Sequence, residues 1–137
     1  MSGTQKSKID MTTGHIMKNI INGNQIKINH LELPASGIIP TEAVLKNVRP
    51  SYAKDKDGKK TELIESVKYD CVNMENFSSF TVKVLSSQQV ITKEALEASD
   101  ELVCIKIPVE ETVIRPYEIA FGVAKVTVLA PYVKLSE

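Results

Sequence analysis

The strongest constraint on the fold is the alternation of residue types in two stretches, 63–72 and 80–85. In the first stretch Val67, Tyr69 and Cys71 occupy every second position, and the residues between them are charged. Successive side chains of a β-strand point to opposite faces, so this period predicts strands with one buried and one polar face. We therefore expect the chain to fold around a β-sheet.

The remaining sequence adds three strands and one short helix. Asp57-Gly58 is a strong hairpin-turn signal, and Pro50 is expected to end the strand before it. Thr92 is a candidate helix N-cap, with Glu94 in the first turn, where negative charge is favoured. The predicted elements are strands at 42–49, 63–72 and 80–85, a helix at 92–99, a strand at 102–107, a loop around 110–116 and a last strand at 121–129 that could reach 135.

The predicted elements follow one another as three strands, a helix and two strands. This is the element order of an OB-fold, a partly open Greek-key barrel. We therefore predict an all-β domain with one short helix, a five-stranded OB-fold barrel, over residues 40–137. A small β-sandwich usually has more strands and no such helix, and a doubly wound α/β fold needs alternating helices and strands. Residues 1–39 are predicted to be a flexible, extended N-terminal arm, because residues 1–16 have few large apolar groups.

The net charge of zero conceals an uneven distribution. Residues 1–60 contain ten basic and five acidic side chains, whereas residues 61–137 contain seven basic and twelve acidic ones. Segment 46–60 is the most basic, with six basic and two acidic side chains. Lysines on a loop suit contact with phosphates, which need charge rather than fixed geometry. The alternative is a solvated hairpin that is kept polar for solubility.

The sequence contains no signal for a membrane span or for secretion. No run approaches the roughly 18 apolar residues of a membrane helix, and the N-terminus lacks an apolar signal core. We therefore expect a cytoplasmic protein without membrane contact. Cys71 and Cys104 lie in strand-like stretches and are expected to be free, buried thiols. A disulfide between them stays open, because sequence spacing does not say whether they meet.

Residue types that carry catalysis or bind metals are sparse. The histidines, His15 and His30, both lie in the predicted arm, where a general base would not be held in position. No nucleophile, phosphate-loop, dinucleotide or metal-ligand motif occurs. Glu110 and Glu111 are adjacent, so in an extended chain they point to opposite faces. We expect neither an enzyme nor a bound cofactor or metal.

The predicted fold assigns the basic and aromatic residues to a nucleic-acid groove. The loop after the first strand, the face of the second and third strands, and the loop before the last strand surround the groove of an OB-fold. Tyr69 and Phe80 share faces with apolar residues and are expected in the core, whereas Phe77 lies at a turn and is expected to be exposed. The predicted nucleic-acid-binding residues are Lys46, Arg49, Tyr52, Lys54, Lys56, Lys59, Lys60, Lys68, Phe77, Lys83, Arg115 and Tyr117.

Four segments carry a family resemblance: Ala43-Val-Leu-Lys-Asn-Val-Arg-Pro-Ser-Tyr52, Asp57-Gly58-Lys-Lys, Val67-Lys-Tyr-Asp-Cys71 and Gly122-Val-Ala-Lys-Val-Thr-Val128. They resemble the small OB-fold single-stranded-DNA-binding proteins of Gram-positive phages and conjugative plasmids. The resemblance implies sequence-independent coating of single strands, often by an oligomer. The chain departs from the familiar bacterial type, because it has no Trp and lacks a long acidic, Gly/Pro-rich tail.

Two functions follow as hypotheses. The first is a single-stranded DNA-binding protein in replication, recombination or conjugative transfer of a mobile element, with RNA or duplex DNA as other possible ligands. The arm would then link copies into a homo-oligomer, for example by adding a strand to a neighbouring barrel. The second is a small β-barrel adaptor that binds other proteins and no nucleic acid.

Overall fold

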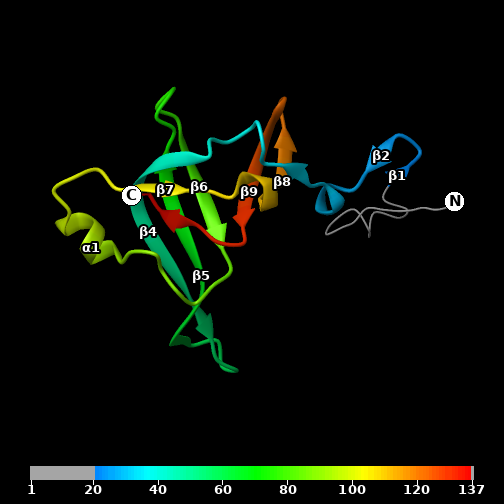
Figure 1. The fold of residues 1–137 in the computed structure, drawn as a ribbon. Helices are drawn as coiled ribbons and strands as arrows, with labels where there is room; N and C mark the ends of the chain where they lie inside the picture. Colours follow the sequence, from blue (N-terminus) through cyan, green and yellow to red (C-terminus); the bar gives the residue numbers. More distant parts are fainter. Residues whose placement is uncertain (1–20, 137) are drawn as a thin grey trace, which may run out of the picture. The chain divides into compact units, whose positions relative to one another are not determined.

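The structure is a computed structural model that describes residues 21–136 (Figure 1). The chain forms two compact units, Met1–Leu31 and Glu32–Glu137. The described part of the first unit contains an antiparallel pair, β1 (Ile21–Asn22) and β2 (Gln25–Ile26), and the 3-10 helix η2 (Ile28–His30). Residues 1–20 of the predicted arm, including His15, lie outside the described residues.

The second unit is built on one eight-stranded mixed sheet. The strand order is β10-β7-β4-β5-β6-β9-β8-β3, and every pair is antiparallel except β6 with β9, which is parallel. The elements are β3 (Leu33–Pro34), β4 (Glu42–Lys54), β5 (Lys60–Val72), β6 (Ser79–Val84), α1 (Lys93–Ala98), β7 (Cys104–Lys106), η3 (Val109–Glu111), β8 (Val113–Ala120), β9 (Val123–Ala130) and β10 (Lys134–Leu135).

The predicted all-β class with one short helix is confirmed for the described residues, but the prediction of five strands is wrong. In the second unit the sequence did not predict β3 and β8, and β10 lies where the last strand was expected to reach. Residues 110–116, predicted as a loop, instead complete η3 and begin β8. β3 pairs with β8 only at Val113 and Ile114, so the rest of β8 is an edge strand. Pro116 lies in this part, where β3 is not paired with β8. Edge strands tolerate a residue that lacks the backbone N–H.

The same reason explains why Pro50 does not end the first predicted strand. β4 continues through Pro50 to Lys54, with Pro50 opposite Val67 of β5. On its other side β4 pairs with β7 only at Glu42–Val44, so Pro50 interrupts no ladder there. The resulting β4–β5 hairpin extends beyond the other strands, at the bottom of Figure 1.

The core is made of side chains that face one another across the strands. Val48, Tyr69, Val82 and Val128 are in register on β4, β5, β6 and β9, and all four are buried. The period predicted from Val67, Tyr69 and Cys71 therefore identified the buried face correctly. Burial of these apolar side chains provides the main driving force for folding.

The short helix begins where the sequence predicts. Thr92 is the N-cap of α1, and its hydroxyl accepts a hydrogen bond of 3.1 Å from the backbone N–H of Ala95. Glu94 lies in the first turn, where its charge complements the helix dipole. Leu96 packs against the core and attaches the helix to it.

Tyr69 joins the core to the chain that precedes α1. Its hydroxyl accepts a hydrogen bond of 3.1 Å from the backbone N–H of Val90, and the Tyr69 side chain is buried. We expect Tyr69→Phe to lower the free energy of unfolding by about 1 kcal/mol, because it leaves that N–H without its partner. Urea unfolding followed by circular dichroism measures the difference. Tyr117→Phe is the control, because Tyr117 is exposed; equal effects of the two changes would contradict the prediction.

Candidate nucleic-acid interface

Three basic residues form a row across the sheet on the face opposite the core. Arg49 on β4, Lys68 on β5 and Lys83 on β6 are paired in register. Each directly follows or precedes a buried residue of the core row, so all three point away from the core. Neighbouring strands lie about 4.8 Å apart, so the row places three positive charges across three adjacent strands. We call these residues the basic row.

Asp70 fixes the arginine of the basic row. The carboxylate of Asp70 accepts two hydrogen bonds of 2.8 Å from Arg49, from Nε and one terminal nitrogen, and one of 2.7 Å from the Thr81 hydroxyl. The hydrogen bond from Arg49 is the main reason why the pKa of Asp70 lies below its usual value. A guanidinium has five N–H donors, so Arg49 keeps three for a ligand while its orientation is held.

The two lysines of the basic row differ from Arg49 in their burial and in their ion pairing. Lys68 and Lys83 are half-buried, and neither takes part in the ion pairs found among residues 21–136. Their stems lie on the sheet, which leaves the ammonium groups for solvent or an anion. Lys46 lies nearby in an irregular part of β4, close enough to Asp70 to lower the pKa of that carboxyl further. Two cations, Arg49 and Lys46, therefore act on the Asp70 carboxylate.

The β4–β5 hairpin carries a second group of cations. Lys54 and Lys60 face each other across the hairpin, and Lys56 and Lys59 lie in its turn, all exposed. The Asp55 carboxylate accepts hydrogen bonds of 2.9 Å from two turn amides, those of Asp57 and Lys59, and so shapes the turn. Like charges opposite each other on a ladder are destabilising. A bound polyanion would remove this repulsion.

Tyr52 is engaged within the hairpin. The Nζ of Lys60 lies 4.6 Å from the centre of the Tyr52 ring, a cation–π contact, and the Tyr52 side chain is half-buried. One face of the ring is therefore already covered by a cation. In this arrangement one face of the Tyr52 ring holds Lys60, so at most the other face could stack on a base.

The remaining predicted site residues lie outside these two groups, although Arg115, opposite Thr127 on β9, shares the outer face of the sheet with the basic row. Phe77 is in the turn after β5, whereas the lysine hairpin precedes β5, so the 13 residues of that strand, about 43 Å in length, separate them. Arg115 and Tyr117, predicted in a loop, lie on β8. Arg115 donates a 2.7 Å hydrogen bond to Glu32, and Tyr117 is exposed.

Two cations outside the predicted set belong to the surroundings of the basic row: Lys125 shares its face of the sheet, and Lys93 lines a cavity beside it. Lys125 is on β9, on the same face as Leu129, which is opposite Lys83. Its Nζ is 3.7 Å from a carboxylate oxygen of Glu118. The alternation in residues 123–129 could have identified Lys125. Lys93 is brought close to Lys46 and Asp70 by the packing of α1, and no sequence pattern indicates how this helix packs. Lys93 lines a cavity of about 470 Å³ with Lys46, Asn47, Asp70, Cys71, Ser79, Phe80 and Glu97.

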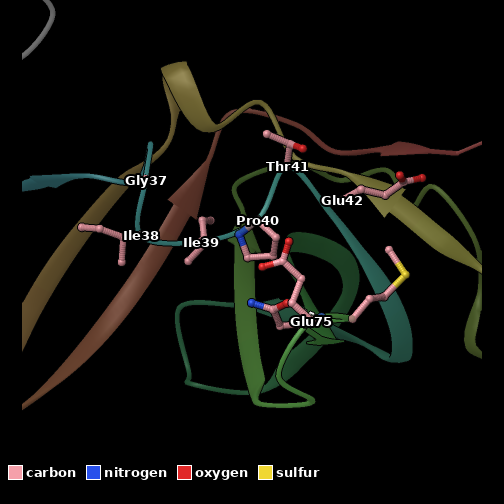
Figure 2. A pocket seen from close by; sticks show the side chains of 9 residues that line it. Gly37, Ile38, Ile39, Pro40, Thr41, Glu42 and Glu75 are labelled. Atoms are coloured by element: carbon pink, nitrogen blue, oxygen red, sulfur yellow. Dashed lines mark hydrogen bonds between the residues drawn. The ribbon is translucent and has the colours of Figure 1, made fainter.

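A second cavity, of about 340 Å³, lies between the turn after β5 and the segment before β4 (Figure 2). Figure 2 shows the Glu75 side chain beside Pro40, with Glu42 further along the same rim. Both ionisable side chains lining the cavity are carboxylates, which would repel phosphate. The basic row, not this cavity, is therefore the candidate site for an anionic ligand.

Two cysteines and one histidine lie among the described residues. Both cysteines are free; Cys104 is half-buried, and burial, with the nearby Asp70 charge, raises the pKa of the buried Cys71 thiol to about 12. A thiol with this pKa is protonated at neutral pH and is a poor nucleophile. His30 is exposed in η2. Within residues 21–136 no three His, Cys, Asp or Glu side chains gather to hold a metal ion.

No protein-family model, curated protein or solved structure matches the chain. In the part of the chain that the structure describes, no helix is long and apolar enough to cross a membrane.

The Arg49–Asp70 contact gives a pH-dependent prediction. The pKa of Asp70 is lower in the folded than in the unfolded chain, so its contribution to stability is present at neutral pH and is lost as the pH falls through the folded-state pKa. We expect Asp70→Asn to cost about 1 kcal/mol at pH 7, because Arg49 is partly exposed. Urea unfolding at neutral and strongly acidic pH tests this. The variant and the wild type should converge in acid; a constant difference would contradict the prediction.

Proposed function

We propose that the protein binds single-stranded nucleic acid, DNA in the first instance, through its basic row and the lysines of the β4–β5 hairpin. The observation that carries the proposal is the register of Arg49, Lys68 and Lys83 across three neighbouring strands. Such a row suits a phosphate backbone that crosses the strands, because its side chains would contact the charged phosphates rather than the base edges. Binding should therefore depend little on sequence.

We also propose that the sheet is an OB-fold barrel with two added strands, β8 and the short β3 that pairs with it. Four pairings support this interpretation: β4 pairs with both β5 and β7, β6 runs parallel to β9, and β10 pairs with β7. Only residues 131–133 separate β9 from β10, so one chain segment contacts β6 at one end and β7 at the other. In an OB-fold the last strand closes the barrel in this way, and the face of the second and third strands binds oligonucleotides.

The charge of the protein sets an expectation for affinity. A neutral chain gains little from long-range attraction, so the local cations must provide the electrostatic contribution. Each phosphate contact adds about 0.7 to the slope of log affinity against log salt for a single strand. We propose modest binding that weakens steeply as salt rises. Because the contacts are to phosphate, RNA and duplex DNA remain ligands to be tested beside single-stranded DNA.

A second candidate function is a protein-interaction module. The observation that favours it is the β8–β9 hairpin, on whose two faces five large hydrophobic side chains are exposed: Tyr117, Ile119, Phe121, Val123 and Val126. Contiguous exposed apolar patches often mark interaction sites. A cytoplasmic role in replication, recombination or transfer of a mobile element is a proposal that rests on the sequence resemblance.

The basic row is tested by removing its two lysine charges. Lys68→Gln with Lys83→Gln keeps much of each stem, so it should lower the salt slope by about 1.4, the share of two phosphate contacts. Fluorescence anisotropy of a labelled oligo-dT at several salt concentrations measures the slope.

Lys106→Gln with Lys134→Gln is the matched control. These lysines also form a cross-strand pair, on β7 and β10, and the net charge changes equally. Equal loss in both double variants would mean that net charge, not the basic row, governs binding. Absence of binding by the wild type at low salt would refute the proposed function.

Homo-oligomerisation through the N-terminal arm is a further proposal from the sequence. We expect the full chain to assemble from more copies than a variant that lacks residues 1–31, the first compact unit. Light scattering on both proteins at the same concentration measures the masses. If both have the same oligomeric state, the arm does not link the copies.

A further inference from the structure

Two phenylalanines have a backbone conformation that phenylalanine disfavours. Phe77, in the turn after β5, has φ of 60°, and Phe121, in the β8–β9 turn, has φ of 54°. Among the described residues they are the only non-glycine residues with positive φ. A bulky side chain in this region costs free energy, and such outliers cluster where function requires them.

Phe121 contributes nothing visible to the fold that would compensate this cost. Its side chain is fully exposed, at 103% of the reference area. With Gly122, at φ of 77°, it forms a two-residue turn with two positive φ values, which is the pattern of a type I′ hairpin. Asn-Gly is strongly preferred in that turn. If the only role of residue 121 were to form the turn, Asn would therefore be expected there rather than Phe.

The tip of the β8–β9 hairpin continues the face of the basic row. Leu129 is opposite Lys83, and the residues of β9 on that face lead through Lys125 to Val123, next to the turn. From Leu129 to Phe121 the chain covers eight residues, about 27 Å when extended. Phe77 lies at the same end of the sheet, because β6 and β9 are parallel and the two turns precede them.

We propose that Phe121 stacks on an unpaired nucleobase of a strand that also contacts the basic row, with Phe77 as a second stacking side chain at the same end of the sheet. The inference rests on the proposed function and adds a contact that does not depend on charge. An aromatic ring exposed at a hairpin tip presents an open face, and base–aromatic stacking tolerates any sequence. Lys125 on the same face would attract the connecting phosphates.

The separation of the tip from the basic row makes the proposal testable by ligand length. OB-folds bind about 4 to 16 nucleotides, so a labelled oligo-dT of each limiting length serves as probe. On the long probe we expect Phe121→Asn to weaken binding about tenfold, near the low end of the effect of one stacked base. On the short probe we expect no change, because it cannot reach from the basic row to the tip. The salt slope should stay that of the wild type, since no phosphate contact is lost.

Stability measured on the same variants separates function from folding. Asn fits the left-handed turn better than Phe, so Phe121→Asn should raise the thermal midpoint while it weakens binding. Phe121→Tyr keeps the ring and should bind the long probe like the wild type. Phe77→Asn, in the other turn, should weaken binding of the long probe in the same way.

Several results would overturn the inference while leaving the proposed function intact. They are wild-type affinity of Phe121→Asn for the long probe, equal loss in Phe121→Tyr and Phe121→Asn, or a lower thermal midpoint of Phe121→Asn. A change in oligomeric mass of Phe121→Asn, seen by light scattering, would instead assign the tip to a contact between proteins. If the wild type binds neither probe, the proposed function itself fails.

Discussion

The structure depends on the register of β5 with its two neighbours, β4 and β6. One position of this register aligns Val48, Tyr69 and Val82, and the next aligns Arg49, Lys68 and Lys83. A shift by a single residue would turn the lysines into the core and the valines into solvent. Burial of one row therefore fixes the exposure of the other, and the energy that forms the core also assembles the charged face.

Much of this arrangement is visible in the sequence. The alternation of residues 67–71 identified the buried face, Asp57-Gly58 identified the hairpin, and Thr92 identified the start of the helix. These signals are local, since a strand period, a turn pair and a capping residue each act within a few positions. The row of Arg49, Lys68 and Lys83 needed the register as well, which the sequence does not give.

The predictions that were wrong, or that the sequence did not allow, have a common physical origin. The sequence predicts a strand end at Pro50 and a loop at Pro116, yet both prolines lie inside strands, because each faces a side of its strand where no ladder has to be completed. Whether a strand is at an edge is a property of the whole sheet. The β8–β9 turn was also missed, because Phe121-Gly122 lacks the Asn or Asp that marks such turns. The cavity under α1 depends likewise on how a helix packs, which no single segment encodes.

The basic row lies entirely within β4, β5 and β6, three strands that follow one another in residues 42–84 and pair as neighbours. Their contacts are short in sequence, whereas the pairing of β6 with β9 waits for a segment more than forty residues further along the chain. Local pairings form faster than distant ones. The three strands of the basic row can therefore pair before the strands that finish the sheet have been made, so the charged face can form while the core is still open.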